Sequence, residues 1–161
     1  MTKTSNYKGI VLAGGAGSRL YPLTKVISKQ LLPIYNRPMI YYPLSILINA
    51  KIKDILIITT PEDQENFKKL LGDGSQWGVK LNYSVQEKPE GIAQSLIIAD
   101  KWLKSNPVVL ILGDNLFFGP DLFLKIEKAI NENDGATIFG YHVDDPERYG
   151  VLELDKSNNV L

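Results

Sequence analysis

The chain has 161 residues, enough for one domain with a buried core, and its 44% hydrophobic and 22% charged residues are typical of a globular protein. Its 18 basic and 18 acidic side chains cancel, which excludes a general polyanion binder such as a nucleic-acid-coating protein. Because the chain has no cysteine, disulfide frameworks, thiolate zinc sites and cysteine nucleophiles are excluded as well.

The start of the chain, MTKTSNYKG, is polar and shows no signal peptide. No apolar run approaches the roughly 20 residues that are needed to span a bilayer. The lack of cysteine fits a reducing compartment. These features together predict a soluble, cytoplasmic protein that does not bind a membrane.

Strand-like and helix-like segments alternate along the chain. Apolar runs rich in β-branched residues predict strands, and apolar stripes at helical spacing predict helices. The predicted strands are 7–13, 54–60, 80–85, 108–114, 135–143 and 151–154. The predicted helices are 38–50, which has Pro38 in its first turn, a second from Pro61 to about Leu71 with Thr60 as its N-cap, 91–103 and 121–130.

This alternation predicts an α/β fold: a three-layer sandwich with a mostly parallel, Rossmann-like central sheet. Ligands of such sheets bind across the carboxyl ends of the strands. The segments expected to meet there are the loop at 14–29, the loop at 86–91, Asp114 and the turn near Tyr149.

The stretch GGAGSRLYPLTKVISKQ, residues 14–30, directly follows the first predicted strand. A glycine-rich turn in that place lets backbone N–H groups surround an anion. The stretch lacks the Gly-Lys pair of a P-loop, and it has Leu20 where a dinucleotide fingerprint has its third glycine. A tight turn without a ligand is the remaining alternative. Arg19 and Lys29 argue against it, because two cations on one constrained loop can converge on a triphosphate.

Asp114 follows the apolar run VVLIL and Gly113, at the carboxyl end of a predicted strand. One or two carboxylates together with substrate phosphates are the usual ligands of Mg²⁺. An aspartate that caps a turn is the alternative. Four other aspartates lie near predicted turns and helix ends and are expected to be caps or solvated charges: Asp54, Asp63, Asp73 and Asp100.

The glycine-rich stretch resembles the signature of the sugar nucleotidyltransferases, G-x-G-[ST]-R-L-x-P-L-T-x-x-x-x-K. The form SKQLLPIY followed by PMIYYPLS is similar to the branch of that family that transfers thymidylyl groups. The resemblance continues through SQWGVKLNYSVQEKPEGIAQSLIIA, LILGDNLFFG and DPERYGVLELD, so it covers nearly the whole chain. It implies Mg²⁺-dependent transfer from dTTP to glucose 1-phosphate, giving dTDP-glucose and pyrophosphate, the first step toward dTDP-sugars such as dTDP-rhamnose.

The resemblance also implies a role for each matching position. Arg19 contacts the departing phosphates, Lys29 stabilises the α-phosphate, and Asp114 holds the metal. Tyr149 and Gly150 line the sugar pocket. The nucleotide is bound by Gly14, Gly15, Gly17, Ser18, Arg19, Gln30, Gln86, Pro89 and Gly91, of which Gln30 and Gln86 lie near the base.

Two alternatives stay open: the same chemistry with UTP, and a nucleotide-binding module without turnover. The resemblance implies a homo-oligomer, a tetramer in that family, with no nucleic-acid or membrane partner. Chains of the family are nearly twice as long, and their E-E-K-P stretch and a second metal-binding aspartate follow beyond the part matched here. Residues 1–161 are therefore expected to be a nucleotidyltransferase domain cut before the C-terminal part of the sugar site, with little turnover alone.

Overall fold

The computed structural model describes residues 6–15, 17–156 and 160. The chain divides into two compact units, Met1–Asn131 and Glu132–Leu161. The first unit holds the central sheet and the helices that cover it. Among the described residues, no helix combines the length and the apolar character that a membrane span needs.

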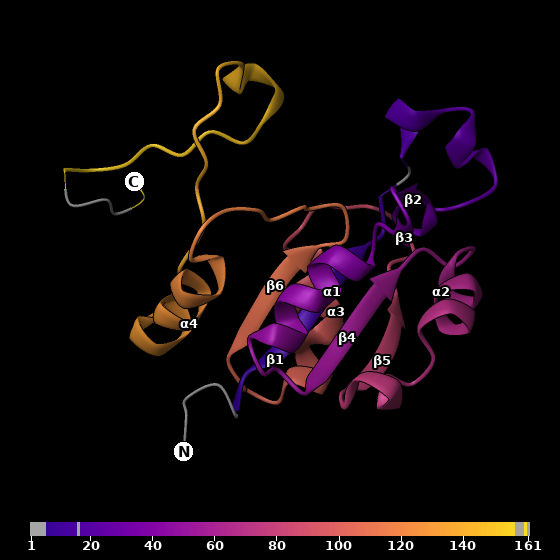
Figure 1. The fold of residues 1–161 in the computed structure, drawn as a ribbon, viewed down its shortest axis with the longest axis horizontal. Coiled ribbons are helices and arrows are strands. Elements are labelled where there is room, and N and C mark those ends of the chain that lie inside the picture. Colours follow the sequence, from indigo (N-terminus) through magenta and orange to yellow (C-terminus); the bar gives the residue numbers. More distant parts are fainter. Residues whose placement is uncertain (1–5, 16, 157–159, 161) are drawn as a thin grey trace. The chain divides into compact units, whose positions relative to one another are not determined.

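Within the described part of the first unit, parallel strands form one sheet in the order β5-β4-β1-β6 (Figure 1). The inner strand β1 pairs with β4 on one side and with β6 on the other, so that its carboxyl end lies in the middle of the sheet. The prediction of a parallel α/β sheet is thus confirmed. The strands are β1 (Lys8–Ala13), β4 (Asp54–Thr59), β5 (Lys80–Val85) and β6 (Val108–Leu112).

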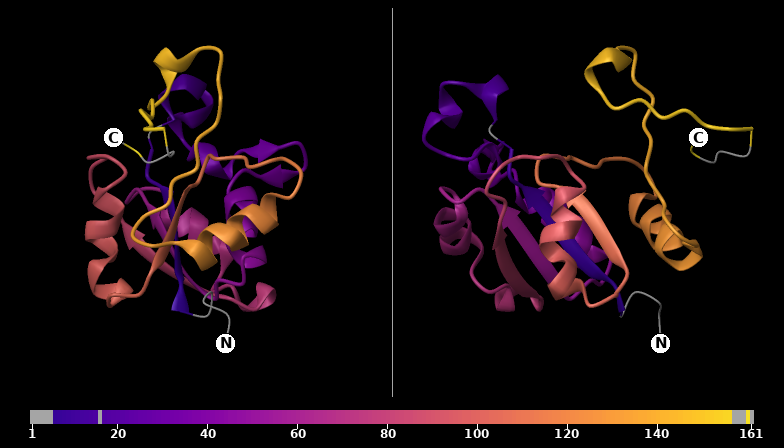
Figure 2. Two further views of the ribbon diagram at one scale, coloured as in Figure 1. Left: turned by 90° about the vertical axis from the view of Figure 1, so that its left-hand side faces the viewer. Right: turned by 180° about the vertical axis from the view of Figure 1, so that it is seen from behind.

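Helices cover both faces of this sheet, as Figures 1 and 2 show from opposite sides. One core cluster joins α1 (Tyr41–Asn49), α2 (Gln64–Leu71) and α4 (Leu122–Glu132) to one face. A second cluster joins α3 (Gln94–Leu103) to the other face. Burial on both faces explains why the inner strands β1 and β4 carry unbroken apolar runs, at Ile10–Ala13 and Ile55–Ile58. The edge strand β5 is less buried and mixes polar with apolar residues.

A small antiparallel pair, β2 (Pro33–Ile34) and β3 (Arg37–Pro38), precedes α1. Pro38 therefore lies in a strand, and its predicted place in the first helical turn is wrong. The backbone explains the difference, because the N–H of Ile40 donates to the carbonyl of Gln30 at 2.9 Å. This hydrogen bond ties Ile40, the residue just before α1, to the segment that precedes the hairpin. α1 therefore begins at Tyr41, later than its apolar stripe suggested.

Two further helices also begin three residues later than predicted. α2 begins at Gln64 with Asp63 in the N-cap position, so the prediction that Thr60 caps this helix is wrong. α3 begins at Gln94, because Gly91 has a φ of 101°, which no helix accommodates.

The second unit contains the 3₁₀ turn η6 (Pro146–Arg148) and an isolated antiparallel bridge between Leu154 and Val160. The predicted strand at 135–143 is wrong, and the one at 151–154 is reduced to that bridge. A strand needs a neighbour for its backbone N–H and C=O groups, and the described residues of this unit supply none. Phe139 and Tyr141 are accordingly exposed despite their strand-like pattern.

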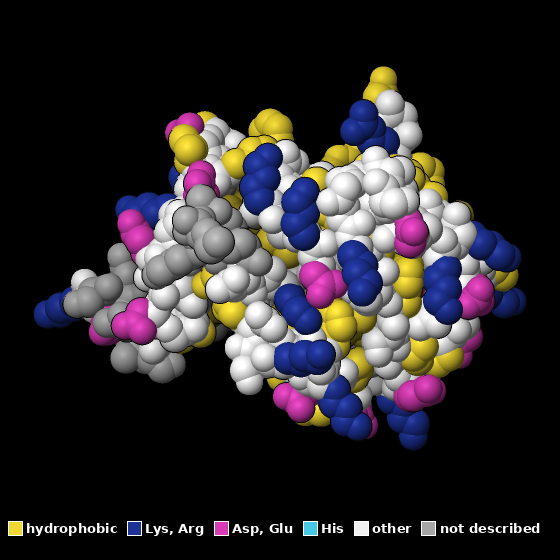
Figure 3. Space-filling view, turned by 90° about the horizontal axis from the view of Figure 1, so that it is seen from below, with side chains coloured by type: hydrophobic (Ala, Val, Ile, Leu, Met, Phe, Trp, Pro, Cys, Tyr) yellow, Lys and Arg dark blue, Asp and Glu magenta, His cyan; other side chains and the backbone are white. Residues whose placement is uncertain are grey.

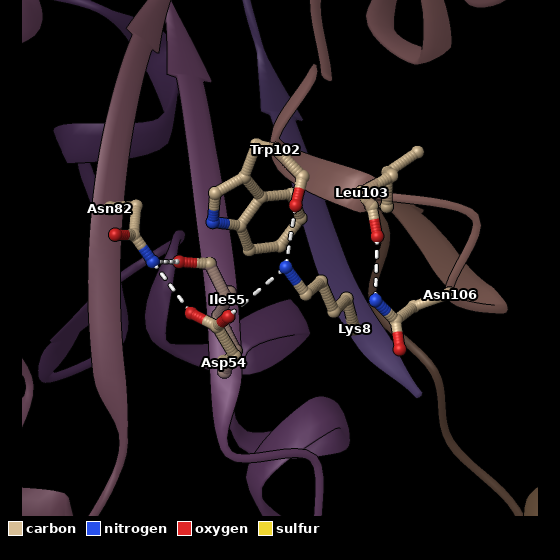
Figure 4. A network of polar contacts seen from close by, with 7 residues as sticks. All are labelled: Lys8, Asp54, Ile55, Asn82, Trp102, Leu103 and Asn106. Carbon is tan, nitrogen blue, oxygen red and sulfur yellow. Dashed lines mark hydrogen bonds and ion pairs between the residues drawn. The ribbon is translucent and has the colours of Figure 1, made fainter. Parts of the chain in front are cut away.

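A polar network fastens the amino-terminal ends of the strands (Figure 4). The ammonium of Lys8 lies 3.4 Å from a carboxylate oxygen of Asp54 and 4.3 Å from the ring centre of Trp102, and it donates to the Trp102 carbonyl. The amide of Asn82 donates to the same carboxylate at 2.7 Å. One lysine and one aspartate thus tie β1, β4 and β5 to the end of α3.

Figure 3 views the molecule from the side on which the strands begin. Lysine and arginine side chains are spread over this face, and aspartate and glutamate side chains lie among them and toward its rim. Mixed charges of this kind are what a solvated protein surface carries.

Candidate nucleotide-binding site

The glycine-rich loop leaves the carboxyl end of β1 at the middle of the sheet. Gly17 has a left-handed φ of 61°, and a Cβ atom there would lie 2.8 Å from Cγ2 of Thr24. Only glycine meets both conditions without strain. The hydroxyl of Thr24 donates to the Gly17 carbonyl at 2.8 Å and so closes the loop, a role that the sequence did not predict. Ala16 lies outside the described residues.

Arg19 follows the glycines in a short 3₁₀ turn, η2 (Ser18–Leu20), and its side chain is exposed. Within the described part of the chain it forms no hydrogen bond or ion pair. Its five N–H donors are therefore open to an anionic ligand. This geometry suits the contact with departing phosphates that the resemblance implies, and that contact stays a prediction.

Lys29 and Asp114 meet although they are 85 residues apart in the sequence. Lys29 begins the 3₁₀ turn η4 (Lys29–Leu31), Asp114 follows β6, and the Lys29 ammonium donates to Oδ2 of Asp114. The two side chains are only 24% and 33% exposed, so both sit at a partly desolvated edge. An ammonium has three donors and a carboxylate about four acceptor sites, and neither group has another bond within the described part of the chain. The pair can therefore bind a ligand without breaking.

A pocket of about 140 Å³ opens beside the glycine-rich loop. An apolar cavity of about 150 Å³ holds benzene, so this space suits one six-membered ring. Five of the predicted nucleotide-binding positions line the pocket together, which confirms that the loops at 14–29 and 86–91 meet. The lining residues are Leu12, Gly14, Gly15, Gln86, Pro89, Gly91 and Ile92.

Gln86 is buried and lines this pocket. A Cβ atom on Gly14 would lie 2.1 Å from the Gln86 Oε1 atom, so only a glycine there lets the amide reach across the loop. The Gln86 Nε2 group donates to Oε1 of Gln94, the first residue of α3. Gln94 was not predicted as a site residue, because a glutamine at the start of a helix carries no distinguishing pattern.

Gln30 occupies a different place from Gln86. It is almost fully buried, accepts a hydrogen bond from the Ser28 hydroxyl, and packs 3.1 Å from where a Cβ atom of Gly113 would lie. It does not line the pocket beside the glycine-rich loop. The structure therefore gives Gln30 a buried packing position beside Gly113, and its contact with a base stays a prediction.

Tyr149 and Gly150 belong to the second unit. Tyr149 follows η6, its N–H donates to the Pro146 carbonyl at 3.0 Å, and its side chain is largely exposed. Their predicted place in a sugar pocket stays a prediction. A larger hollow of about 450 Å³ lies between α1 and the beginning of α4, and none of the predicted site residues lines it.

The Asp114 carboxylate is suited to a Mg²⁺ ion that binds together with the phosphates of a nucleotide. The described residues contain no group of three or more acidic or histidine side chains that could cage a metal. Mg²⁺ beside phosphates does not need such a cage, since one or two carboxylates suffice. Asp114 supplies a partly exposed carboxylate with free acceptor sites next to the loop that carries Lys29.

Similarity to known proteins extends over nearly the whole chain. It is 54% identical over 154 residues to the glucose-1-phosphate thymidylyltransferase of Neisseria gonorrhoeae, covering 96% of this chain and 54% of that protein. It is 50% identical to the enzyme of the same name from Mycobacterium tuberculosis, covering 96% of this chain and 53% of that protein. The chain thus spans about half the length of the curated relatives that it matches.

A crystal structure of a Bacillus anthracis protein named for the same activity, in complex with sucrose, superposes on this fold with a TM-score of 0.86 and 44% identity. It covers 93% of this chain, which spans 61% of that one. Residues 8–161 match the nucleotidyl transferase family. A match of this extent, with the glycine-rich loop and the Lys29–Asp114 pair in place, shows that the chain belongs to the nucleotidyl transferase family.

Proposed function

We propose that this chain is the nucleotide-binding part of an enzyme that transfers a thymidylyl group from dTTP to glucose 1-phosphate. The products are dTDP-glucose and pyrophosphate, and the reaction depends on Mg²⁺. The names of relatives at 50–54% identity support the activity and both substrates. The dependence on Mg²⁺, a role in supplying dTDP-sugars such as dTDP-rhamnose, a cytoplasmic location and a homo-oligomeric assembly belong to the same proposal.

The observation that carries the proposal is the meeting of Lys29 and Asp114 beside the glycine-rich loop. A nucleotidyl transfer needs a cation near the α-phosphorus, a carboxylate near the phosphates for a metal, and a pocket for the base. The described residues bring the cation and the carboxylate into contact, and the ring-sized pocket lies on the same loop.

In the proposed reaction an oxygen of the sugar phosphate attacks the α-phosphorus of dTTP, and the bond to the β-phosphate oxygen breaks. A phosphate monoester has a second pKa of about 6, so its dianion needs no general base at neutral pH. Lys29 stabilises the negative charge that spreads over the α-phosphate oxygens, and Arg19 that of the departing pyrophosphate. Backbone N–H groups of the glycine-rich loop hold the phosphates, while Gln86 faces the base.

Mg²⁺, when bound, neutralises charge on the phosphate oxygens and orients them. Asp114 is the described carboxylate that would hold it. Because the Lys29 ammonium already lies against one Asp114 oxygen, the other oxygen is the one open to a metal. The ion pair then keeps the carboxylate turned toward the phosphates.

The proposal is tested by a matrix of nucleotides and sugar phosphates. The chain is incubated with Mg²⁺, labelled glucose 1-phosphate and each of dTTP, UTP, ATP, CTP and GTP, both alone and fused to the C-terminal half of the gonococcal relative. We expect labelled dTDP-glucose and pyrophosphate from the fused protein with dTTP. Faster turnover with UTP would favour the uridylyl alternative, and binding of dTTP without pyrophosphate release from the fused protein would favour a non-catalytic module.

A further inference from the structure

We infer that Asp63, in the turn between β4 and α2, is a positioning residue that fixes the backbone carrying Lys29. The role of Lys29 in nucleotide binding rests on the proposed function, whereas the contact of Asp63 with the loop does not. The sequence had assigned Asp63 to a helix cap or a solvated charge. Its contacts give it a second task, 35 residues away in the chain.

Both carboxylate oxygens of Asp63 are engaged. Oδ1 accepts the backbone N–H of Ser28 at 3.1 Å, and Oδ2 accepts the hydroxyl of Thr60 at 3.0 Å. The Asp63 N–H in turn donates to the Thr60 hydroxyl at 3.3 Å. Oδ1 thus contacts the loop that carries Lys29, whereas Oδ2 contacts Thr60 within the turn itself.

Ser28 is buried and directly precedes Lys29. Its N–H would lose its partner if the carboxylate were removed, and a buried amide without a partner is unfavourable. The segment would then have to move toward water or rearrange. Either change displaces the backbone from which the Lys29 side chain extends.

The other side of Lys29 is also held. The carbonyl of Gln30 accepts the N–H of Ile40 at 2.9 Å, and the Gln30 side chain accepts the Ser28 hydroxyl. Lys29 thus stands between two anchored residues. A lysine side chain is long and flexible, so a fixed backbone on both sides limits where its ammonium can go. This restriction is what a catalytic cation requires, since a misplacement of about 1 Å can cost about 100-fold in rate.

Asp63 also occupies the N-cap of α2, where a negative charge is favourable by itself. The alternative is therefore a purely local cap, whose loss would weaken the helix and leave Lys29 in place. Two neighbours separate the possibilities. Thr60→Val disturbs the cap but leaves the Asp63–Ser28 contact, and Glu62→Ala removes an exposed charge next to it without touching either.

The experiment compares Asp63→Ala with Thr60→Val and Glu62→Ala in the full chain. We measure hydrogen exchange of the Ser28 amide, the Kd of dTTP with Mg²⁺, and the urea midpoint. Asp63→Ala should speed hydrogen exchange of the Ser28 amide and raise the Kd of dTTP about 10-fold. The two controls should change the Kd less than 2-fold. Asp63→Asn, which keeps an acceptor at Oδ1, should restore most of the affinity and guards against a variant that fails to fold.

A double-mutant cycle with Lys29→Met decides whether Asp63 acts through Lys29. We expect Asp63→Ala to change the Kd less than 2-fold once Lys29 is replaced. An undiminished effect in the Lys29→Met background, or equal effects of Asp63→Ala and Thr60→Val, would overturn the inference. If the unchanged chain binds no dTTP, the proposed function fails, and the exchange rate at Ser28 still tests the contact: an unchanged rate in Asp63→Ala would overturn it.

Discussion

Two lysine–aspartate pairs stand at opposite ends of the central sheet. Lys8 and Asp54 lie where the strands begin, and Lys29 and Asp114 lie where they end. Their exposures are similar, at 16% and 34% for the first pair and 24% and 33% for the second. Burial alone does not distinguish a structural pair from a functional one.

The surroundings of the two pairs do differ. Lys8 also contacts the ring and the carbonyl of Trp102, and Asp54 also accepts the amide of Asn82 (Figure 4). Within the described part of the chain, the side chains of Lys29 and Asp114 form no hydrogen bond or ion pair except the one with each other. A saturated pair fastens elements together, whereas an unsaturated pair keeps donors and acceptors for a ligand. This difference predicts that the first pair affects stability and the second affects function.

The largest effect is expected from Asp114→Asn. The substitution keeps the shape but removes the charge that pairs with Lys29 and would hold Mg²⁺ in the proposed reaction, so turnover by the fused protein should fall by about 1000-fold. The urea midpoint should stay close to that of the unchanged protein, because the pair is partly exposed. The measurement is pyrophosphate release at limiting Mg²⁺. Normal turnover there would make Asp114 a turn cap.

Arg19→Ala should lower turnover nearly as much as Asp114→Asn. The guanidinium has no partner in the described part of the fold, so its removal leaves no group unsatisfied and should not change stability. Loss of a donor to the departing pyrophosphate should lower kcat by roughly 100- to 1000-fold. Arg19→Lys should restore little, because it lacks the planar fork. An unchanged kcat in single-turnover assays would remove Arg19 from the mechanism.

Lys8→Met should lower the stability of the protein and leave the affinity for dTTP unchanged, the opposite of what we expect for Asp114→Asn and Arg19→Ala. The variant leaves Asp54 without its charged partner and removes the contact with the Trp102 ring. The free energy of unfolding should fall by about 1–3 kcal/mol, as measured by urea denaturation. The Kd of dTTP should stay within 2-fold at temperatures where the protein is folded. A clear loss of affinity in the folded variant would mean that the two ends of the sheet are coupled.

The inner strands β1 and β4 could be predicted because they are buried on both faces and their apolar runs are local in the sequence. That the loop at 14–29 and Asp114 lie at one edge also followed from the rule that parallel strands end together, but the contact between Lys29 and Asp114 was not predicted. What the sequence did not predict depends on partners far away in the chain. Asp63 follows Thr60 in a pattern that any helix cap would show, and nothing local marks its contact with Ser28.

The predicted strand at 135–143 failed for a related reason. An apolar alternation shows that a segment is able to form a strand, but a strand also needs a neighbour. The described residues of the second unit offer only the bridge of Leu154 with Val160. At Pro38 a neighbour is present and the pattern was misread. A proline suits the first turn of a helix, but it suits a short edge strand equally well, and Pro38 pairs with Pro33 in the β2–β3 hairpin.

Thr24→Val should have the smallest effect and sharpens the comparison most. Valine keeps the methyl group that packs against Gly17 but cannot donate to the Gly17 carbonyl. The lost hydrogen bond amounts to about 0.5–1.5 kcal/mol, or about 2- to 10-fold in an equilibrium constant. Because the bond closes a loop rather than joining core elements, we expect this loss in the Kd of dTTP and not in the urea midpoint. An equal loss in the midpoint would show that the glycine-rich loop belongs to the stable core, in which case the two ends of the sheet would differ less than their polar contacts suggest.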